Sequence, residues 1–182
     1  MGTLQPPARS EVQISAADAT LVGELTVPES AGNLVLFAHG SGSSRHSPRN
    51  QFVSQKLNDA GLATLLLDLL TRDEEAVDVR IAQHRFDIEL LAERLVHATQ
   101  WARRNAGTRQ FRLGNFGAST GGAAALVAAA ALPRDVGAVV SRGGRPDLAG
   151  NELPRVRAPT LLIVGGEDHV VIDLNEQARA QM

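Results

Sequence analysis

Ser119 lies in the stretch Gly117-Ala118-Ser119-Thr120-Gly121, which has the pattern G-x-S-x-G. The apolar segment 111–116 precedes this stretch, and an alanine-rich run from Ala123 to Leu132 follows it. A strand, a sharp turn and a helix in this order form a nucleophile elbow, which pushes the serine hydroxyl out of the sheet. The N–H of Thr120, at the start of the helix, is then the first expected donor to an oxyanion. The same residues also fit an ordinary glycine-rich turn whose helix is capped by Ser119 or Thr120.

Two more polar loops follow apolar segments. The loop His39-Gly40-Ser41-Gly42 follows the apolar run 33–38, and Gly165-Gly166-Glu167-Asp168 follows the run 160–164. Asp168 comes after Ser119 in the chain, as does the acid of Ser…Asp…His enzymes, although it also suits an N-cap of the last helix. Ser41 is the expected second oxyanion donor, and a plain glycine-rich connection is the alternative for its loop.

Strands and helices alternate along most of the chain. An antiparallel hairpin is expected at the start, and 71–78 is acidic and reads as a loop. Regular alternation predicts an α/β fold with a mostly parallel sheet, whose binding site lies at the carboxyl ends of the strands. We expect strands at 11–16, 20–27, 33–38, 62–67, 111–116, 136–140 and 160–164, and helices at 48–60, from 88 to Gly107, at 123–132 and at 170–182.

Composition excludes several classes of protein. The chain has 182 residues, a formal net charge of −2 and no cysteine, which predicts one domain of 1–182 without disulfides or thiolate metal sites. We expect no nucleic-acid partner, no membrane span and no metal or cofactor. The first ten residues lack the apolar core of a signal peptide, so a cytoplasmic location is expected. The glycine-rich loop 39–44 lacks the lysine of a P-loop, which disfavours nucleotide binding.

The three loops around Ser41, Ser119 and Asp168 together resemble the α/β-hydrolase superfamily, in particular the dienelactone-hydrolase-like serine hydrolases. The resemblance implies a three-layer sandwich with strand order 1-2-4-3-5-6-7 and an antiparallel first pair. It also implies hydrolysis of an ester, lactone or similar acyl bond of a small molecule through an acyl-serine intermediate, without a cofactor. Dienelactone hydrolases proper carry a cysteine nucleophile where this sequence has Ser119.

In that family the base is a histidine that follows one further strand, beyond the position of Met182. The resemblance therefore implies a chain truncated at its C-terminus, without the base histidine, the last strand and the last helix. Of the five histidines, His84 and His97 are expected on the long helix, while His39, His46 and His169 stay open as substitutes. We expect weak or absent turnover, and a non-catalytic small-molecule-binding or interaction module is the alternative.

Further residues are candidates for substrate binding and assembly. Arg142 and Arg145 follow the strand 136–140 and could clamp a substrate carboxylate, with solvated loop arginines as the alternative. His39 and Gly40 border the same edge. Without a further strand, Thr160 to Val164 forms an exposed apolar sheet edge, which predicts marginal stability or a homodimer through that edge.

Overall fold

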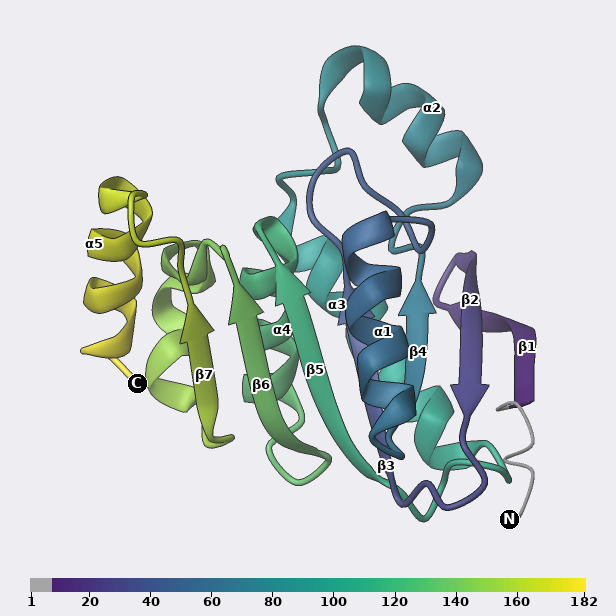
Figure 1. Ribbon diagram of the computed structural model, residues 1–182. Helices are drawn as coiled ribbons and strands as arrows, with labels where there is room; N and C mark the ends of the chain where they lie inside the picture. Colours follow the sequence, from purple (N-terminus) through teal and green to yellow (C-terminus); the bar gives the residue numbers. More distant parts are fainter. Residues whose placement is uncertain (1–7) are drawn as a thin grey trace.

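Seven strands form one sheet in the order β1-β2-β4-β3-β5-β6-β7 in the computed structural model, which describes residues 8–182 (Figure 1). This order is the expected one. β2 runs antiparallel to both β1 and β4, and the other neighbouring pairs are parallel. The signal-peptide prediction rests mainly on residues 1–7, which lie outside the described residues. The strands are β1 (Ala8–Ala16), β2 (Ala19–Val27), β3 (Asn33–Ala38), β4 (Ala63–Leu67), β5 (Arg112–Ala118), β6 (Val136–Arg142) and β7 (Thr160–Ile163).

Helices cover both faces of the sheet, which confirms the three-layer α/β sandwich (Figure 1). α1 (Pro48–Asp59) packs on β4 from one face, while α3 (Ile88–Arg104) and α4 (Thr120–Ala131) cover the other face. The 3-10 helix η1 (Pro146–Arg155) packs against α4, and α5 (His169–Arg179) packs against η1 beyond β7. α2 (Arg72–Ile81) projects above the carboxyl ends of the strands. No helix within residues 8–182 has the length and apolar character needed to cross a bilayer.

The main core lies between the sheet and the layer of α3 and α4. α3 contributes the buried residues Leu91, Leu95, Ala98 and Ala102, which repeat at helical spacing. The alanines of α4 at 123–125, 128 and 129 are fully buried, and their small side chains let this helix lie close to β5 and β6. On the other face, Phe37 and Phe116 stack with ring centroids 4.9 Å apart beneath α1.

The loop expected at Thr71 to Asp78 is wrong, because this stretch forms most of α2. A capping box starts the helix: the hydroxyl of Thr71 accepts from the N–H of Glu74 at 3.2 Å, and the Glu74 carboxylate accepts from the N–H of Thr71 at 2.7 Å. Smaller differences occur elsewhere. His84 lies in the connection between α2 and α3, not on the long helix; α3 ends before Gly107, and α4 begins at Thr120.

Candidate active site

Ser119 occupies the turn between β5 and α4, with a backbone conformation that few residues other than glycine adopt. Its φ is 52° and its ψ is −125°, and its side chain is exposed. Ser119 is the N-cap residue of α4 by position, but its hydroxyl makes no hydrogen bond to the helix, so the alternative that its side chain caps α4 is wrong. Backbone strain of this kind costs on the order of 1–3 kcal/mol and persists at functional sites because the surrounding structure enforces it.

Three glycines make this turn possible. A Cβ on Gly117 would collide with the carbonyl of Gly121, and a Cβ on Gly121 would collide with the carbonyl of Ala38 at the end of β3. A Cβ on Gly40 would lie 2.8 Å from the Cβ of Ser119. The end of β3 therefore lies directly against the Ser119 turn, and the loop after β3 borders the serine.

Thr120 and Ser41, the two expected oxyanion donors, are linked by their side chains. The hydroxyls of Ser41 and Thr120 are 3.1 Å apart, and the Ser41 hydroxyl donates to the carbonyl of Arg85 at 3.1 Å. Thr120 is buried, and within the described residues its hydroxyl bonds to Ser41 and not to a backbone N–H of α4, so the alternative that Thr120 caps the helix is wrong. Within the described residues, the backbone N–H groups of Ser41 and Thr120 donate no hydrogen bond, so both remain available to an acceptor.

His39 is held by hydrogen bonds at both ring nitrogens. Nδ1 donates to the carbonyl of Gly40 at 3.0 Å, and Nε2 accepts from the N–H of Leu69 at 3.0 Å. The residue is 7% exposed, and its burial lowers the pKa of the ring below the usual value of 6.5, although the Gly40 carbonyl and nearby carboxylates oppose the shift. His39 is thus a neutral ring with no free nitrogen to take up a proton from Ser119.

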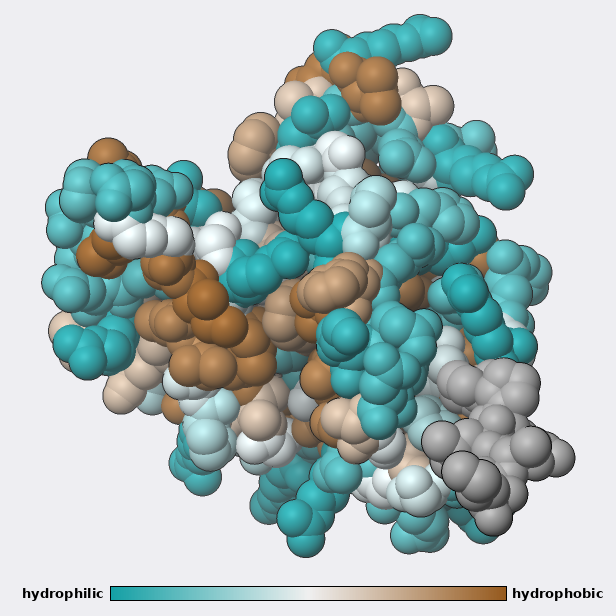
Figure 2. Space-filling model, in the orientation of Figure 1, coloured by the Kyte–Doolittle hydropathy of each residue, from teal (hydrophilic) through white to brown (hydrophobic). Residues whose placement is uncertain are grey.

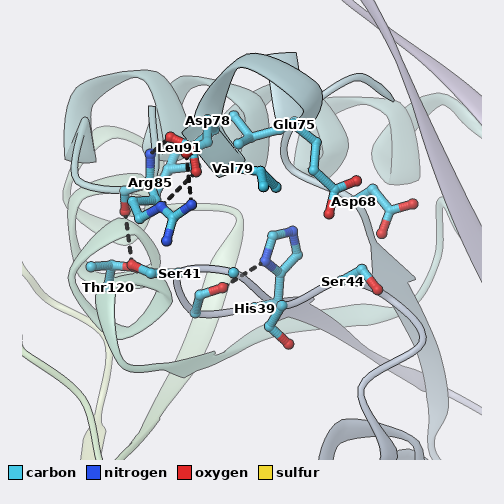
Figure 3. Close-up of a pocket in the computed structure, with 14 residues that line it drawn as sticks. His39, Ser41, Ser44, Asp68, Glu75, Asp78, Val79, Arg85, Leu91 and Thr120 are labelled. Carbon is cyan, nitrogen blue, oxygen red and sulfur yellow. Dashed lines mark hydrogen bonds and ion pairs between the residues drawn. The ribbon is translucent and has the colours of Figure 1, made fainter. Parts of the chain in front are cut away.

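A pocket opens between this loop and α2, and Arg85 and Asp78 line it together with Ser41 and Thr120 (Figure 3). The Asp78 carboxylate accepts from the N–H groups of His84 at 2.7 Å and Arg85 at 2.9 Å, and from Nε of Arg85 at 2.7 Å. Burial alone would raise the pKa of Asp78, but these hydrogen bonds and the guanidinium lower it below 3.8. Neither residue was predicted from the sequence, because the segment that carries them shows no apolar periodicity.

Of the two candidate arginines, Arg142 is the last residue of β6 and Arg145 lies in the loop that follows, and both make contacts within the chain. The guanidinium of Arg145 donates to both oxygens of Asp147, at 2.8 and 2.7 Å, and this carboxylate raises the pKa of Arg145 above its usual value. Arg142 donates to the side chain of Asn50 at 3.3 Å and lies over the ring of Phe116, 5.7 Å from its centroid. Neither guanidinium is unpaired.

Asp168 lies after β7, at the carboxyl edge of the sheet, and caps α5. Its carboxylate accepts from the N–H of Val171 at 3.4 Å, and the residue is exposed. His46 and His169 are exposed as well. Among residues 8–182, no histidine makes a hydrogen bond to the hydroxyl of Ser119 or to the carboxylate of Asp168, and no three metal-binding side chains of the His, Asp and Glu types gather into one site.

Curated relatives cover a longer chain than this one. A Mycobacterium tuberculosis protein named as a putative phosphoribosyl transferase is 57% identical to this chain over 176 residues. The match takes in 96% of this chain and 39% of the relative, so this chain spans about two fifths of the curated relatives it matches.

Solved structures share the fold. The crystal structure of a dienelactone hydrolase from Anabaena variabilis ATCC 29413 is 58% identical, has a TM-score of 0.96, and is matched over 98% of this chain and 82% of that one. Est1E from Butyrivibrio proteoclasticus, 14% identical with a TM-score of 0.73 over 92% of this chain and 84% of its own, has the same fold. The profile of the Dienelactone hydrolase family matches residues 25–182. The chain therefore belongs to the dienelactone hydrolase family.

Proposed function

We propose that this protein is a serine hydrolase that cleaves an ester, lactone or similar acyl bond, with Ser119 as its nucleophile. The observation that carries the proposal is the strained backbone of the exposed residue Ser119 at a strand-to-helix turn, with its hydroxyl free of any capping role. This is the geometry of a nucleophile elbow. Membership of the dienelactone hydrolase family supports the same reaction class.

The surroundings of Ser119 suit an acyl-transfer reaction. The serine oxygen would attack the carbonyl carbon, and the oxyanion so formed would accept hydrogen bonds from the N–H groups of Thr120 and Ser41, which have no other acceptor within the described residues. Collapse of this intermediate breaks the bond to the leaving alkoxide, which takes up the proton that the serine hydroxyl lost on attack and departs as the alcohol. The acyl-serine that remains is hydrolysed by water, which frees the serine and releases the acid. Asp168, at the same edge of the sheet, is the proposed acid.

In this proposal the rate is limited because, within the described residues, no histidine is placed to accept the proton of the Ser119 hydroxyl. His39 has both ring nitrogens in hydrogen bonds, and among the described residues the exposed His46 and His169 make no hydrogen bond to Ser119. A serine hydroxyl without a base is a poor nucleophile, although an oxyanion hole and substrate binding alone sustain a residual rate of about 10³–10⁴-fold over water. We therefore expect this chain to turn over weakly.

A non-catalytic binding module is the second candidate. It is favoured by one observation: within residues 8–182, no histidine makes a hydrogen bond to Ser119. Such a module would keep the pocket between α2 and the loop after β3, with its mixed lining of Leu70, Val79, Ser41 and Arg85, but it would bind an acyl compound without forming a covalent bond.

Labelling with a fluorophosphonate separates the two candidates. A hydrolase should be modified at Ser119, and the Ser119→Ala variant should lose the label. Ser30→Ala changes an exposed turn serine that is far from Ser119 in the sequence, and this variant should be labelled as fast as the unchanged protein. Hydrolysis of p-nitrophenyl acetate should show a small rate that depends on Ser119. Absence of labelling, with the compound bound reversibly, would favour the binding module.

A further inference from the structure

The loop that follows β6 is hydrogen-bonded to the backbone of the Ser119 turn. The N–H of Arg145 donates to the carbonyl of Ser119 at 3.1 Å, and the same carbonyl accepts from the N–H of Gly122 at 3.0 Å. Gly143, two residues earlier in the loop, donates to the carbonyl of Ile163 at the end of β7 at 2.6 Å. The arginine singled out in the sequence for its guanidinium thus contacts the candidate nucleophile through its backbone.

This loop lies tightly against the start of α4. A Cβ on Gly144 would collide with the hydroxyl of Ser141, and a Cβ on Gly122 would lie 2.5 Å from the same hydroxyl. Ser141 is fully buried, and within the described residues its hydroxyl has no hydrogen-bond partner. The loop therefore fits here only because two glycines face a small buried side chain, and a shift of the loop would displace the turn.

Asn175 holds the other side of the loop. This residue lies on α5, is 4% exposed, and donates from its side-chain amide to the carbonyl of Gly144 at 3.1 Å and to that of Val171 at 2.7 Å. Gly144 directly precedes Arg145. The same helix carries Asp168 at its N-cap, so Asn175 joins the element that bears the proposed acid to the loop that holds the carbonyl of Ser119.

We propose that Asn175 is a positioning residue for Ser119. Its amide fixes Gly144, Gly144 fixes the N–H of Arg145, and that N–H fixes the carbonyl of the strained serine. The role in reactivity rests on the proposed function, because it presumes that Ser119 is the nucleophile. Displacement of a reacting group by about 1 Å can cost on the order of 10²-fold in rate, so a support of this kind affects reactivity without contacting substrate.

Two variants at this position and one control test the proposal. Asn175→Ala removes the amide, and Asn175→Asp keeps its shape but has no N–H to donate to Gly144. Leu174→Ala, a half-buried neighbour on α5, weakens helix packing without removing the hydrogen bond. For each variant, hydrogen exchange at the backbone N–H of Arg145 is measured by NMR. The rate of fluorophosphonate labelling at Ser119 is measured as well, together with kcat and KM for p-nitrophenyl acetate.

Both Asn175 variants should exchange the Arg145 amide about tenfold faster, which corresponds to the loss of one hydrogen bond. Labelling of Ser119 and kcat should fall by about tenfold or more with KM nearly unchanged, and Leu174→Ala should alter neither. Unchanged exchange at Arg145 overturns the proposal. Faster exchange at Arg145 with unchanged labelling also overturns the proposal, because the hydrogen bond of Asn175 would then not affect the reactivity of Ser119. If Ser119 is unlabelled even in the unchanged protein, the proposed function fails, while the exchange data still decide whether Asn175 holds the loop.

Discussion

His39 joins the loop that carries Ser41 to the end of β4, and it does so as a neutral ring. Nδ1–H donates to the Gly40 carbonyl, and the unprotonated Nε2 accepts from the N–H of Leu69. A proton on Nε2 would oppose the N–H of Leu69 and remove that hydrogen bond. Burial adds to this effect, and together they keep the pKa of His39 below 6.5.

This arrangement predicts that stability depends on pH. Well above pH 6.5 the imidazole is neutral in both the folded and the unfolded chain. As the pH falls below 6.5, the unfolded chain takes up a proton that the folded chain resists, so the free energy of unfolding decreases, by at most about 1.4 kcal/mol per pH unit. Urea unfolding at pH 7.5 and pH 5.5 measures the difference. His39→Asn should reduce it, whereas His169→Asn, at an exposed position, should not.

For single residues, the sequence predicts the features that depend on steric contacts between residues close together in the chain. It does not predict the features that depend on long-range contacts. The spacing of Gly117, Ser119 and Gly121 indicates a sharp turn because the collision that excludes a side chain at Gly117 occurs within the same segment. The partner of His39 is the N–H of Leu69, which only the pairing of β3 with β4 brings into contact. No local pattern reveals it.

Among the elements, α2 is held mainly by polar contacts at its two ends. At its start, Glu74 accepts from the buried guanidinium of Arg94 at 2.9 Å. At its end, Asp78 accepts from the backbone and side chain of Arg85. Val79 and Ile81 are 72% and 63% exposed. A helix fixed in this way has no apolar stripe, and this is why the sequence pattern indicated a loop at 71–78, whereas the amphipathic α3 was predicted.

Removal of the Asp78 carboxylate should release the C-terminal end of α2. Asp78→Ala deletes the hydrogen bonds to His84 and Arg85, and because hydrogen bonds to charged groups contribute about 1.5–3 kcal/mol, segment 72–87 should open more often. Limited proteolysis should then cut within this segment at least several-fold faster. Asp73→Ala, which removes an exposed carboxylate from the first turn of α2, is the matched control. Equal cleavage rates for the two variants would contradict the prediction.

For the whole molecule, the alternation of apolar strands with helices determines the class of fold, and the family resemblance supplies the strand order. Alternation alone predicts a mostly parallel sheet, but it does not reveal that β2 runs antiparallel to β4 as well as to β1. The position of α5 relative to the Ser119 turn was also beyond the sequence, because it depends on Asn175 and Gly144, which lie 31 residues apart.

β7 is the edge strand of the sheet, and its outer side is unpaired within the described part of the chain. Within residues 8–182, β7 pairs with β6 alone, and Leu161 and Ile163 are 56% and 44% exposed in an apolar patch over β6 and β7 (Figure 2). Unpaired apolar edges associate readily, so we propose that this chain forms a homodimer through β7. Light scattering after size exclusion should show a dimer, and Ile163→Lys should convert it to a monomer. Val77→Lys, at an equally exposed apolar position on α2, should leave the dimer intact. A stable monomer of the unchanged chain at micromolar concentration would contradict this proposal.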